Sequence, residues 1–203
     1  MLSGDLKGYK IILASGSPRR KELLEKLGLK FEVLVKSWEE NYPAGLKGKD
    51  IALYLASAKA EHMRSEIADN VIVIAADTIV WCKDKTLDKP SDREEALDIL
   101  KEISGNTHEV ITGVCILSRN RKTTFFCSTK VTFNILTDEE MQYYVEKYEP
   151  YDKAGAYGIQ EWIGVAACSR IEGSFFNVVG LPSDMLYAEL KKFIKQTPEP
   201  DNI

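Results

Sequence analysis

One short apolar run limits the possible folds of this chain more than any other segment. Residues 71–76 (VIVIAA) are apolar on both faces, which predicts a central strand in a sheet covered on both sides. The run leads into Asp77-Thr78, where we expect the strand to end. A carboxylate there is costly to bury unless it is paired, hydrogen-bonded or holding a metal. Because ligands gather at strand ends in open α/β sheets, we predict that Asp77 is functional.

A second strand, residues 11–14, runs into a turn of small residues and then into a helix. Pro18 suits the first turn of a helix, and Ser17 is its expected N-cap. The free N–H groups of that turn favour an anion, and Arg19 and Arg20 add two forked cations. A surface corner that merely carries basic residues is the alternative, since neither a Walker loop nor a G-x-G-x-x-G spacing is present.

We interpret this corner as a phosphate cradle, and we expect the Asp77 carboxylate to face it from the same side of the sheet. The rest of the chain alternates strands and helices without a linker, so residues 1–203 are expected to form one α/β domain that ends in a frayed tail, 197–203. Strands are predicted at 30–36, 79–87 (a hairpin turning near 83–85), 108–118 and 122–136, the last two as an antiparallel pair joined by a short turn. Helices are predicted at 50–68, after a capping box at 91–94, at 138–148 after a second capping box at 137–140, and at 183–195.

Several polar residues have both an ordinary and a functional interpretation. Glu40, in the loop 37–43, is either solvated or turned inward toward a metal. Lys59 either extends past the core to water or reaches into a cleft. Lys89 lies at a rigid corner, where an ordinary exposed charge is the alternative to a functional role. Gln160 ends a segment of small residues that permits close approach to a ligand, but a water-bonded loop glutamine fits equally well.

The composition excludes several classes of protein. A net charge of −4 disfavours general nucleic-acid binding and anionic membrane surfaces, although a basic pocket can still select a small anion. The four cysteines form no C-x-x-C pair and are predicted to be buried thiols in a reducing compartment, and with two histidines a zinc site is not expected. No membrane-spanning run or signal-peptide core is seen, so a cytoplasmic location is expected.

Five segments together resemble one family, the Maf nucleotide pyrophosphatases. They are residues 14–20 (ASGSPRR), 76–80 (ADTIV), 88–90 (DKP), 152–160 (DKAGAYGIQ) and 179–182 (VGLP). The resemblance implies an elongated, mixed and twisted β-sheet flanked by helices, with two lobes around a central cleft, as in the inosine-triphosphate pyrophosphatases. It also implies hydrolysis of nucleoside triphosphates to the monophosphate and pyrophosphate, a divalent cation (Mg²⁺ or Mn²⁺) and a homodimer.

The resemblance also implies roles for individual residues. Asp77 matches the proposed proton acceptor and, with Glu40, the metal site, although the alignment does not separate Glu40 from Glu39. Lys59, Lys89 and Arg20 match cations that contact phosphate, and Ser15 belongs to the same substrate-binding corner. The positions that separate the subfamilies hold Arg19, Thr78 and Gln160, which is the pattern of the dTTP/UTP group.

Chemistry refines two of these roles. A carboxylate with a pKa of about 4 is a poor base at neutral pH, so we hypothesise that Asp77 acts chiefly by metal coordination and water positioning. The Gln160 amide can pair with uracil or thymine but, when rotated, also with cytosine, so Arg19 would have to reject cytosine. A nucleotide-sensing regulator of cell division that binds without turnover is the alternative function. An RNA-binding module is disfavoured by the acidic balance.

Overall fold

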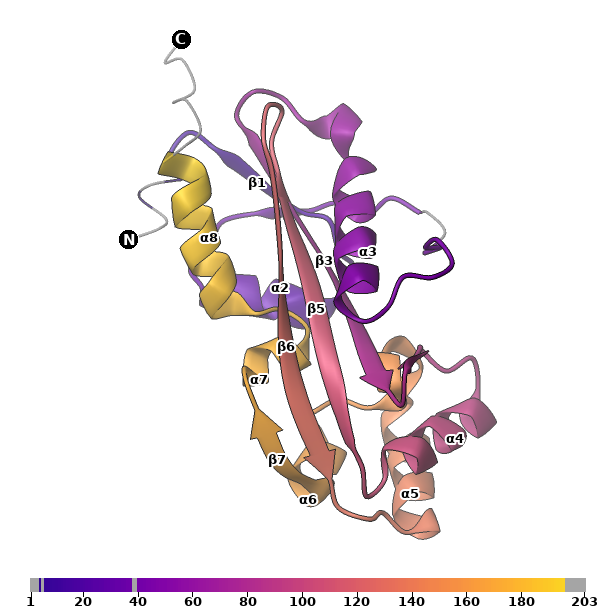
Figure 1. The fold of residues 1–203 in the computed structure, drawn as a ribbon. Helices are drawn as coiled ribbons and strands as arrows, with labels where there is room; N and C mark the ends of the chain where they lie inside the picture. Colours follow the sequence, from indigo (N-terminus) through magenta and orange to yellow (C-terminus); the bar gives the residue numbers. More distant parts are fainter. Residues whose placement is uncertain (1–3, 5, 38–39, 196–203) are drawn as a thin grey trace.

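The computed structural model describes residues 4, 6–37 and 40–195, and a seven-stranded mixed sheet forms its centre (Figure 1). The strand order is β2-β1-β3-β5-β6-β7, and β4 pairs with the far end of β3. β1 is parallel to β2 and β3, and the other pairs are antiparallel. The strands are β1 (Lys10–Leu13), β2 (Glu32–Val33), β3 (Val71–Cys82), β4 (Lys85–Leu87), β5 (Thr107–Leu117), β6 (Lys122–Phe133) and β7 (Cys168–Glu172).

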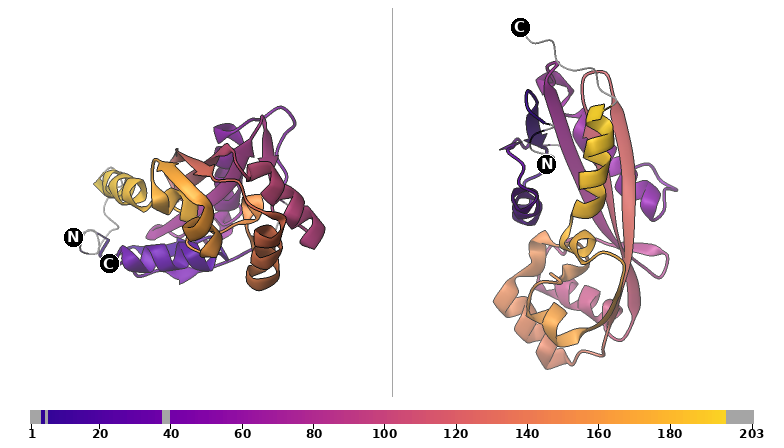
Figure 2. Two further views of the ribbon diagram at one scale, coloured as in Figure 1. Left: turned by 90° about the horizontal axis from the view of Figure 1, so that it is seen from below. Right: turned by 90° about the vertical axis from the view of Figure 1, so that its left-hand side faces the viewer.

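Helices cover both faces of this sheet, which confirms the predicted α/β class (Figure 2). The α-helices are α2 (Pro18–Lys26), α3 (Lys49–Glu61), α4 (Arg93–Ile103), α5 (Asp138–Tyr148), α6 (Trp162–Ala167), α7 (Phe175–Val179) and α8 (Ser183–Lys195). Short 3-10 helices lie at Arg64–Glu66, Pro150–Asp152 and Ala154–Ala156. None of the described helices combines the length and the apolarity needed to cross a membrane.

The apolar run in β3 is buried on both faces, as its sequence predicts. Ile72 and Ile74 pack into a cluster with α2 and α8, whereas Val73 and Ala75 pack into a second cluster with α3. Successive side chains of a strand point to opposite faces, so a strand covered on both sides needs apolar residues at every position. The central position of this strand is therefore confirmed.

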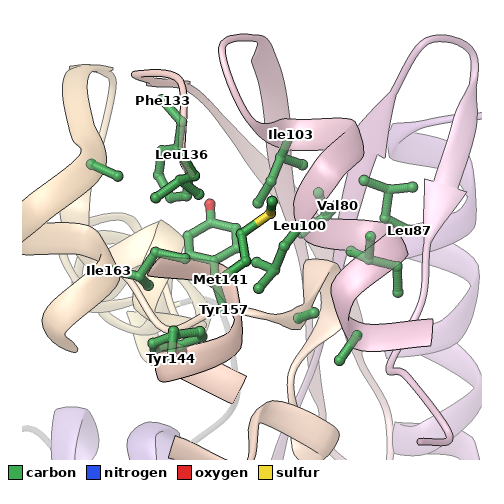
Figure 3. Packing of buried hydrophobic residues seen from close by; sticks show 14 of the residues in the cluster. Val80, Leu87, Leu100, Ile103, Phe133, Leu136, Met141, Tyr144, Tyr157 and Ile163 are labelled. Carbon is green, nitrogen blue, oxygen red and sulfur yellow. The ribbon is translucent and has the colours of Figure 1, made fainter. Parts of the chain in front are cut away.

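The long strands β3, β5 and β6 continue into a second apolar core at the other end of the molecule (Figures 1 and 3). This core is formed with α4, α5 and α6, and Phe133, Tyr144 and Tyr157 are among its buried side chains. On the face covered by α2 and α8, the polar residues Thr78 and Thr112 lie between this core and the cluster that Ile72 and Ile74 form with α2 and α8. Neither threonine belongs to either of these two groups of apolar residues. The sheet thus joins two lobes, with a polar zone between them.

A glycine lets α3 lie very close to the sheet. Gly113 is the partner of Asp77 in the ladder between β3 and β5. A Cβ at Gly113 would lie 2.3 Å from the Ala52 carbonyl oxygen of α3, which no real side chain tolerates. The close contact brings the second half of α3, including Lys59, over the middle of β3.

The predicted end of the strand at Asp77 is wrong, because β3 runs on to Cys82. β5 pairs with β3 without interruption from Val73 to Trp81. On the other side, β1 pairs with β3 only as far as Ile74, and β4 begins to pair at Val80. The middle of β3, residues 75–79, therefore has a strand partner on one side only, and Asp77 lies within this open edge.

Other differences concern the ends of elements. Only Glu32–Val33 forms a strand within 30–36, and the helix predicted for 50–68 ends at Glu61. The N-cap of α4 is Asp92 rather than Ser91, because the Asp92 side chain accepts the Glu95 N–H. Cys82 and Cys115 are buried as predicted, but Cys127 and Cys168 are only partly buried. The predicted frayed tail, 197–203, lies outside the described residues.

Candidate active site

All nine predicted site residues line one cavity of about 730 Å³ at the open edge of β3. Their side chains come from seven parts of the chain: the turn before α2, the first turn of α2, the loop before α3, α3 itself, β3, the corner after β4 and the loop 152–160. The residues are Ser15, Arg19, Arg20, Glu40, Lys59, Asp77, Thr78, Lys89 and Gln160.

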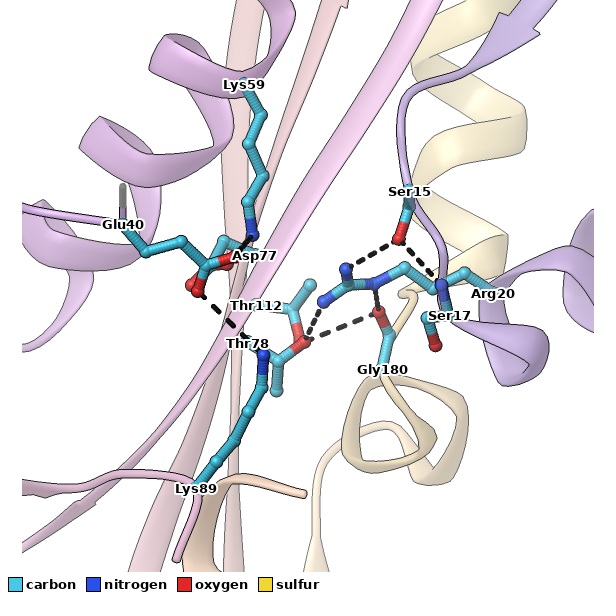
Figure 4. A network of polar contacts seen from close by, with 10 residues as sticks. All are labelled: Ser15, Ser17, Arg20, Glu40, Lys59, Asp77, Thr78, Lys89, Thr112 and Gly180. Carbon is cyan, nitrogen blue, oxygen red and sulfur yellow. Dashed lines mark hydrogen bonds and ion pairs between the residues drawn. The ribbon is translucent and has the colours of Figure 1, made fainter. Parts of the chain in front are cut away.

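Asp77 is buried, with 6% of its surface exposed, and it forms an ion pair with Lys59 of α3 (Figure 4). The same ammonium group lies 2.8 Å from Oε1 of Glu40, and Lys89 Nζ lies 3.9 Å from Oε2 of Glu40. The two carboxylates and the two ammonium groups thus alternate in one continuous row of ion pairs. Lys59 reaches into the cavity rather than past the core to bulk water, since its side chain is 13% exposed.

The Lys59 and Lys89 charges also control the ionisation of Glu40. Partial burial by itself would raise the pKa of Glu40, but the hydrogen bond from Lys59 and the charges of Lys59 and Lys89 outweigh it and hold the pKa below its ordinary value. Glu40 is therefore a carboxylate at neutral pH, available as an oxygen ligand. Glu39, the alternative in the same loop, lies outside the described residues.

Arg20 braces the opposite wall of the cavity (Figure 4). Its guanidinium donates to the Gly180 carbonyl oxygen at 2.9 Å, to Ser15 Oγ at 3.0 Å and to Thr78 Oγ1 at 2.9 Å. Burial lowers the pKa of Arg20, and the nearby Asp77 carboxylate opposes that effect. A guanidinium has five N–H donors, so two remain for an anion.

The predicted cradle is only partly available to an anion. Ser17 is the N-cap of α2 by position, but its side chain makes no capping bond. Its backbone N–H donates to Ser15 Oγ at 3.3 Å, and that hydroxyl also accepts from Arg20. The Ser17 N–H and one N–H of Arg20 are therefore already used by the Ser15 hydroxyl and are not available to an anion.

Asp77 does not face the arginines from the same side of the sheet, so that expectation is wrong. Alternation along β3 directs Asp77 to the α3 face, with Val73 and Ala75. Thr78 points to the other face, where Arg20 binds it. Both groups nevertheless line one cavity, because the edge of β3 between them has no strand partner.

The loop that ends at Gln160 lies on the Thr78 face. A Cβ at Gly155 would be 2.8 Å from Cγ2 of Val80, which shares that face with Thr78. Arg19 reaches the start of the same loop and donates to Asp152 Oδ2 at 2.9 Å. Gln160 is exposed to the cavity. The three residues that separate the subfamilies by resemblance are therefore gathered on one side of β3.

The cavity is cationic although the whole chain carries a net charge of −4. Four carboxylates line it among the described residues, against six cationic side chains, which are Arg19, Arg20, Lys36, Lys59, Lys89 and Lys153. A local excess of positive charge in an acidic protein attracts a small anion rather than a nucleic acid. This charge pattern fits the predicted phosphate ligand.

The donor set also fits a divalent cation. Asp77 and Glu40 both contact Lys59 Nζ, so their oxygens converge on one point. Mg²⁺ is commonly held by one or two carboxylates together with substrate phosphates. Within the described residues, no cluster of three or more His, Cys, Asp or Glu side chains is arranged to hold a metal. A cation bound by this pair would complete its shell with phosphate oxygens and water.

Sequence reasoning missed the ion pairs behind the Gln160 loop. Lys153 is 8% exposed and contacts both Asp152 and Glu161. These residues lie in irregular segments, where no periodicity predicts burial. The only signal was a run of charged residues around a small-residue segment, and that pattern usually indicates a solvated loop.

The sequence is similar to one protein family and to several known proteins. The family profile described as "Maf-like protein" matches residues 10–193. A dTTP/UTP pyrophosphatase of Porphyromonas gingivalis is 54% identical over 192 residues, covering 93% of this chain and 96% of that protein. A dTTP/UTP pyrophosphatase of Flavobacterium johnsoniae is 48% identical over 194 residues, covering 96% of this chain and 100% of that protein.

The chain is also similar to a solved structure, the nucleoside-triphosphatase / dITP/XTP pyrophosphatase of Mycobacterium abscessus. That likeness has 13% identity and a TM-score of 0.40, covering 93% of this chain and 98% of that chain.

Proposed function

Because this chain belongs to the Maf family, we propose that it hydrolyses dTTP and UTP to the nucleoside monophosphate and pyrophosphate. Relatives of that name, 54% and 48% identical over more than nine-tenths of the chain, support the substrate class. The observation that carries the proposal is the cavity itself. The proposed phosphate-binding groups Asp77, Lys59, Glu40 and Lys89 line it on the α3 face of β3. Arg20, also proposed to bind phosphate, lines it on the other face with the candidate base-reading groups.

On the α3 face, Asp77 is proposed to hold and orient the water that attacks the α phosphorus. Lys59 neutralises this buried carboxylate in the free protein and, with Lys89, would neutralise charge on the departing pyrophosphate. Arg20 has two N–H donors left for a phosphate oxygen. These groups surround the polyphosphate without forming a covalent bond to it.

A divalent cation, Mg²⁺ or Mn²⁺, would be held by Asp77 and Glu40. When bound, it would lower the pKa of a water ligand and neutralise phosphate charge. Support comes from the two carboxylates that converge on Lys59 Nζ. Asp77 is proposed to act chiefly as a ligand of this cation and as a positioner of water, rather than as a free base.

On the other face, Gln160 is proposed to pair with N3–H and a carbonyl oxygen of uracil or thymine. Arg19 would reject cytosine, because a guanidinium offers only donors and cannot accept from an exocyclic amine. Thr78 borders the same region through its bond to Arg20. A buried polar group that is left unpaired is a strong means of discrimination.

We further propose that the protein is a homodimer and acts in the cytoplasm. The homodimer rests on the family resemblance alone. The location is supported by four free cysteines, all in the described part of the chain, which are typical of a reducing compartment. Light scattering of the purified protein tests the first point, and localisation of the tagged chain in cells tests the second.

The activity is tested by pyrophosphate release from a panel of dTTP, UTP, CTP, GTP and dATP, each with Mg²⁺, Mn²⁺ or a chelator. We expect release from dTTP and UTP, dependence on the metal, and pyrophosphate rather than orthophosphate as the product. Tight binding of UTP without turnover would favour a nucleotide-sensing regulator instead. Equal turnover of every nucleotide would contradict the proposed substrate class.

A further inference from the structure

A buried lysine connects the two elements that carry the candidate base-reading residues. Lys153 Nζ lies 2.7 Å from Asp152 Oδ1 and 3.3 Å from Glu161 Oε1, and the Lys153 side chain is 9% exposed. A lysine is almost never buried this deeply unless it is paired. Its two carboxylate partners flank the loop that ends in Gln160, so the ammonium group ties the two ends of that loop together.

Asp152, the first partner of Lys153, also binds Arg19. Asp152 Oδ2 accepts from Arg19 Nη1 at 2.9 Å, while Asp152 Oδ1 accepts from Lys153 at 2.7 Å. The Asp152 side chain is 56% exposed, so an ion pair with Arg19 alone would be weak and mobile. The bond from the buried Lys153 fixes the carboxylate, and the carboxylate in turn fixes the Arg19 guanidinium.

Glu161, the second partner of Lys153, holds the backbone next to Gln160. Glu161 follows Gln160 directly, and its Oε2 accepts from the Tyr144 hydroxyl, which accepts from the Gly158 N–H at 2.9 Å. Burial and the Glu161 carboxylate raise the pKa of Tyr144, so its hydroxyl remains a donor at neutral pH. The backbone of Gln160 is therefore held on both sides while its amide stays exposed to the cavity.

Glycine at position 158 permits this arrangement. A Cβ there would lie 2.7 Å from the carboxyl carbon of Glu161, and it would push Glu161 away from both Tyr144 and Lys153. The close approach of the Gly158 backbone to the Glu161 carboxylate allows polar contacts to run without a break from Gly158 through Tyr144 and Glu161 to Lys153.

We propose that Lys153 is a positioning residue for base selection, which holds Arg19 and Gln160 at a fixed separation without touching the base. The inference rests on the proposed function, in which those two residues read the pyrimidine. Hydrogen-bonding groups discriminate only when their positions are fixed, because a displaced donor or acceptor pairs equally poorly with every base. Both candidate readers depend on the same ammonium group for their positions.

The test uses Lys153→Met, which keeps the unbranched apolar part of the side chain and removes the ammonium group. Asp152→Asn is the second variant; the Asp152 carboxylate is exposed, so its change to an amide should leave folding intact. The matched control is Lys192→Met, because Lys192 is an exposed lysine of α8 with one carboxylate partner, Glu189, at 2.6 Å. Thermal unfolding is measured for each full-length variant.

Dissociation constants are measured by calorimetry for analogues of UTP and CTP with an imido bridge between the α and β phosphates, in the presence of Mg²⁺. We expect the preference of the wild type for the UTP analogue to fall roughly tenfold to a hundredfold in Lys153→Met, and in the same direction in Asp152→Asn. The preference should be unchanged in Lys192→Met.

A thermodynamic cycle separates positioning from direct reading. In the Arg19→Ala/Gln160→Ala background, adding Lys153→Met should change the remaining preference no further, because the groups it positions are gone. A further fall there would mean that Lys153 reads the base itself, which overturns the proposal. An unchanged preference in Lys153→Met with a lowered Tm would reveal a purely structural role.

If Lys153→Met does not fold, Asp152→Asn decides, and an unchanged preference in it overturns the proposal. Turnover by the wild type is assayed in parallel. Binding with base preference but without turnover would refute the proposed hydrolysis and leave the role of Lys153 standing. A wild type with no preference between the two analogues would refute the role of Lys153.

Discussion

Asp77 and Lys59 show how single residues depend on one another in this cavity. A buried carboxylate next to an ammonium group is stable as a pair, whereas removal of one partner leaves an uncompensated charge in a poorly solvated site. Lys59 also contacts Glu40, so its position responds to both carboxylates. Occupation of the cavity by a cation and a polyphosphate would redistribute these pairs rather than create a site from nothing.

Asp77→Asn should lower the rate of pyrophosphate release by at least about a hundredfold at saturating metal, because it removes both the charge and the basic oxygen. The assay is steady-state pyrophosphate release from UTP, with thermal unfolding as a check on the fold. Activity within about tenfold of the wild type would contradict both the metal-binding and the water-positioning role of Asp77.

His108 predicts a dependence of stability on pH. It is 2% exposed, its Nε2 is 2.7 Å from the Tyr157 hydroxyl, and burial lowers the pKa of His108 from 6.5 to about 4. Below pH 6.5 the unfolded chain binds a proton at this position and the native protein does not. The free energy of unfolding should therefore fall by about 2 kcal/mol from this residue as the pH drops from 7.5 to 5.

Urea unfolding at pH 7.5, 6 and 5 measures this effect. His108→Phe removes the titrating group and suits the aromatic contacts with Phe133 and Tyr157. Its stability should change less between pH 7.5 and 5 than that of the wild type, even if it is lower throughout. Parallel pH profiles for the two proteins would show that His108 is not responsible.

At the scale of elements, the site depends on where strands stop pairing. β1 pairs with β3 up to Ile74 and β4 pairs from Val80, so the β3 edge between them is open. β5 supports β3 along its other side throughout. A strand held firmly on one side and open on the other can present Asp77 and Thr78 on opposite faces of the same cavity.

Gly113→Ala should destabilise the packing of α3 on this strand. Its Cβ would lie 2.3 Å from the Ala52 carbonyl oxygen, which is backbone and cannot rotate away. We expect a loss of roughly 3 kcal/mol in the free energy of unfolding, at the upper end of overpacking, together with lower activity because α3 carries Lys59.

Gly16→Ala is the control for this prediction. A Cβ at Gly16 would lie 3.6 Å from Val35 Cγ2, an ordinary contact, so its stability should stay within about 1 kcal/mol of the wild type. Urea unfolding measures both variants. Equal stability of the two would mean that α3 moves away from β5 without cost.

At the scale of the whole molecule, the cavity lies between two apolar cores that share the long strands. Arg20 connects segments on either side of it, since it joins the turn before α2, the middle of β3 and the chain before α8. Arg20 and Gly180 are 160 residues apart in the sequence. One side chain thus links the beginning and the end of the chain.

Arg20→Lys should therefore cost stability as well as substrate affinity. A lysine is a point charge and cannot donate to three acceptors in a planar arrangement, so at least one of Ser15, Thr78 and the Gly180 carbonyl loses its partner. We expect a loss of roughly 2 to 4 kcal/mol in the free energy of unfolding. Denaturant unfolding without nucleotide is the measurement, and a stability equal to the wild type would leave Arg20 with a role in binding alone.

The predictions from sequence succeeded where the physics is local. Thr137 and Glu140 form the predicted capping box, and α5 begins and ends as predicted, because the bonds involved span three residues. The hairpin between β5 and β6 was predicted for the same reason. The end of β3 was mispredicted, since a polar residue in a strand is tolerated when distant elements supply its partners.

The sequence alone determined that residues 71–76 form a central strand, that a cationic corner lies where α2 begins, and that the chain resembles one family through five segments. Those features depend on side-chain periodicity and on residue types, which a linear chain carries. Only the tertiary structure decided that Lys59 is the partner of Asp77, that the arginines lie across the edge of β3, and that Lys153 is buried behind the loop of Gln160. Such contacts join residues distant in the chain, and their energies depend on burial and distance, which appear only when the elements pack.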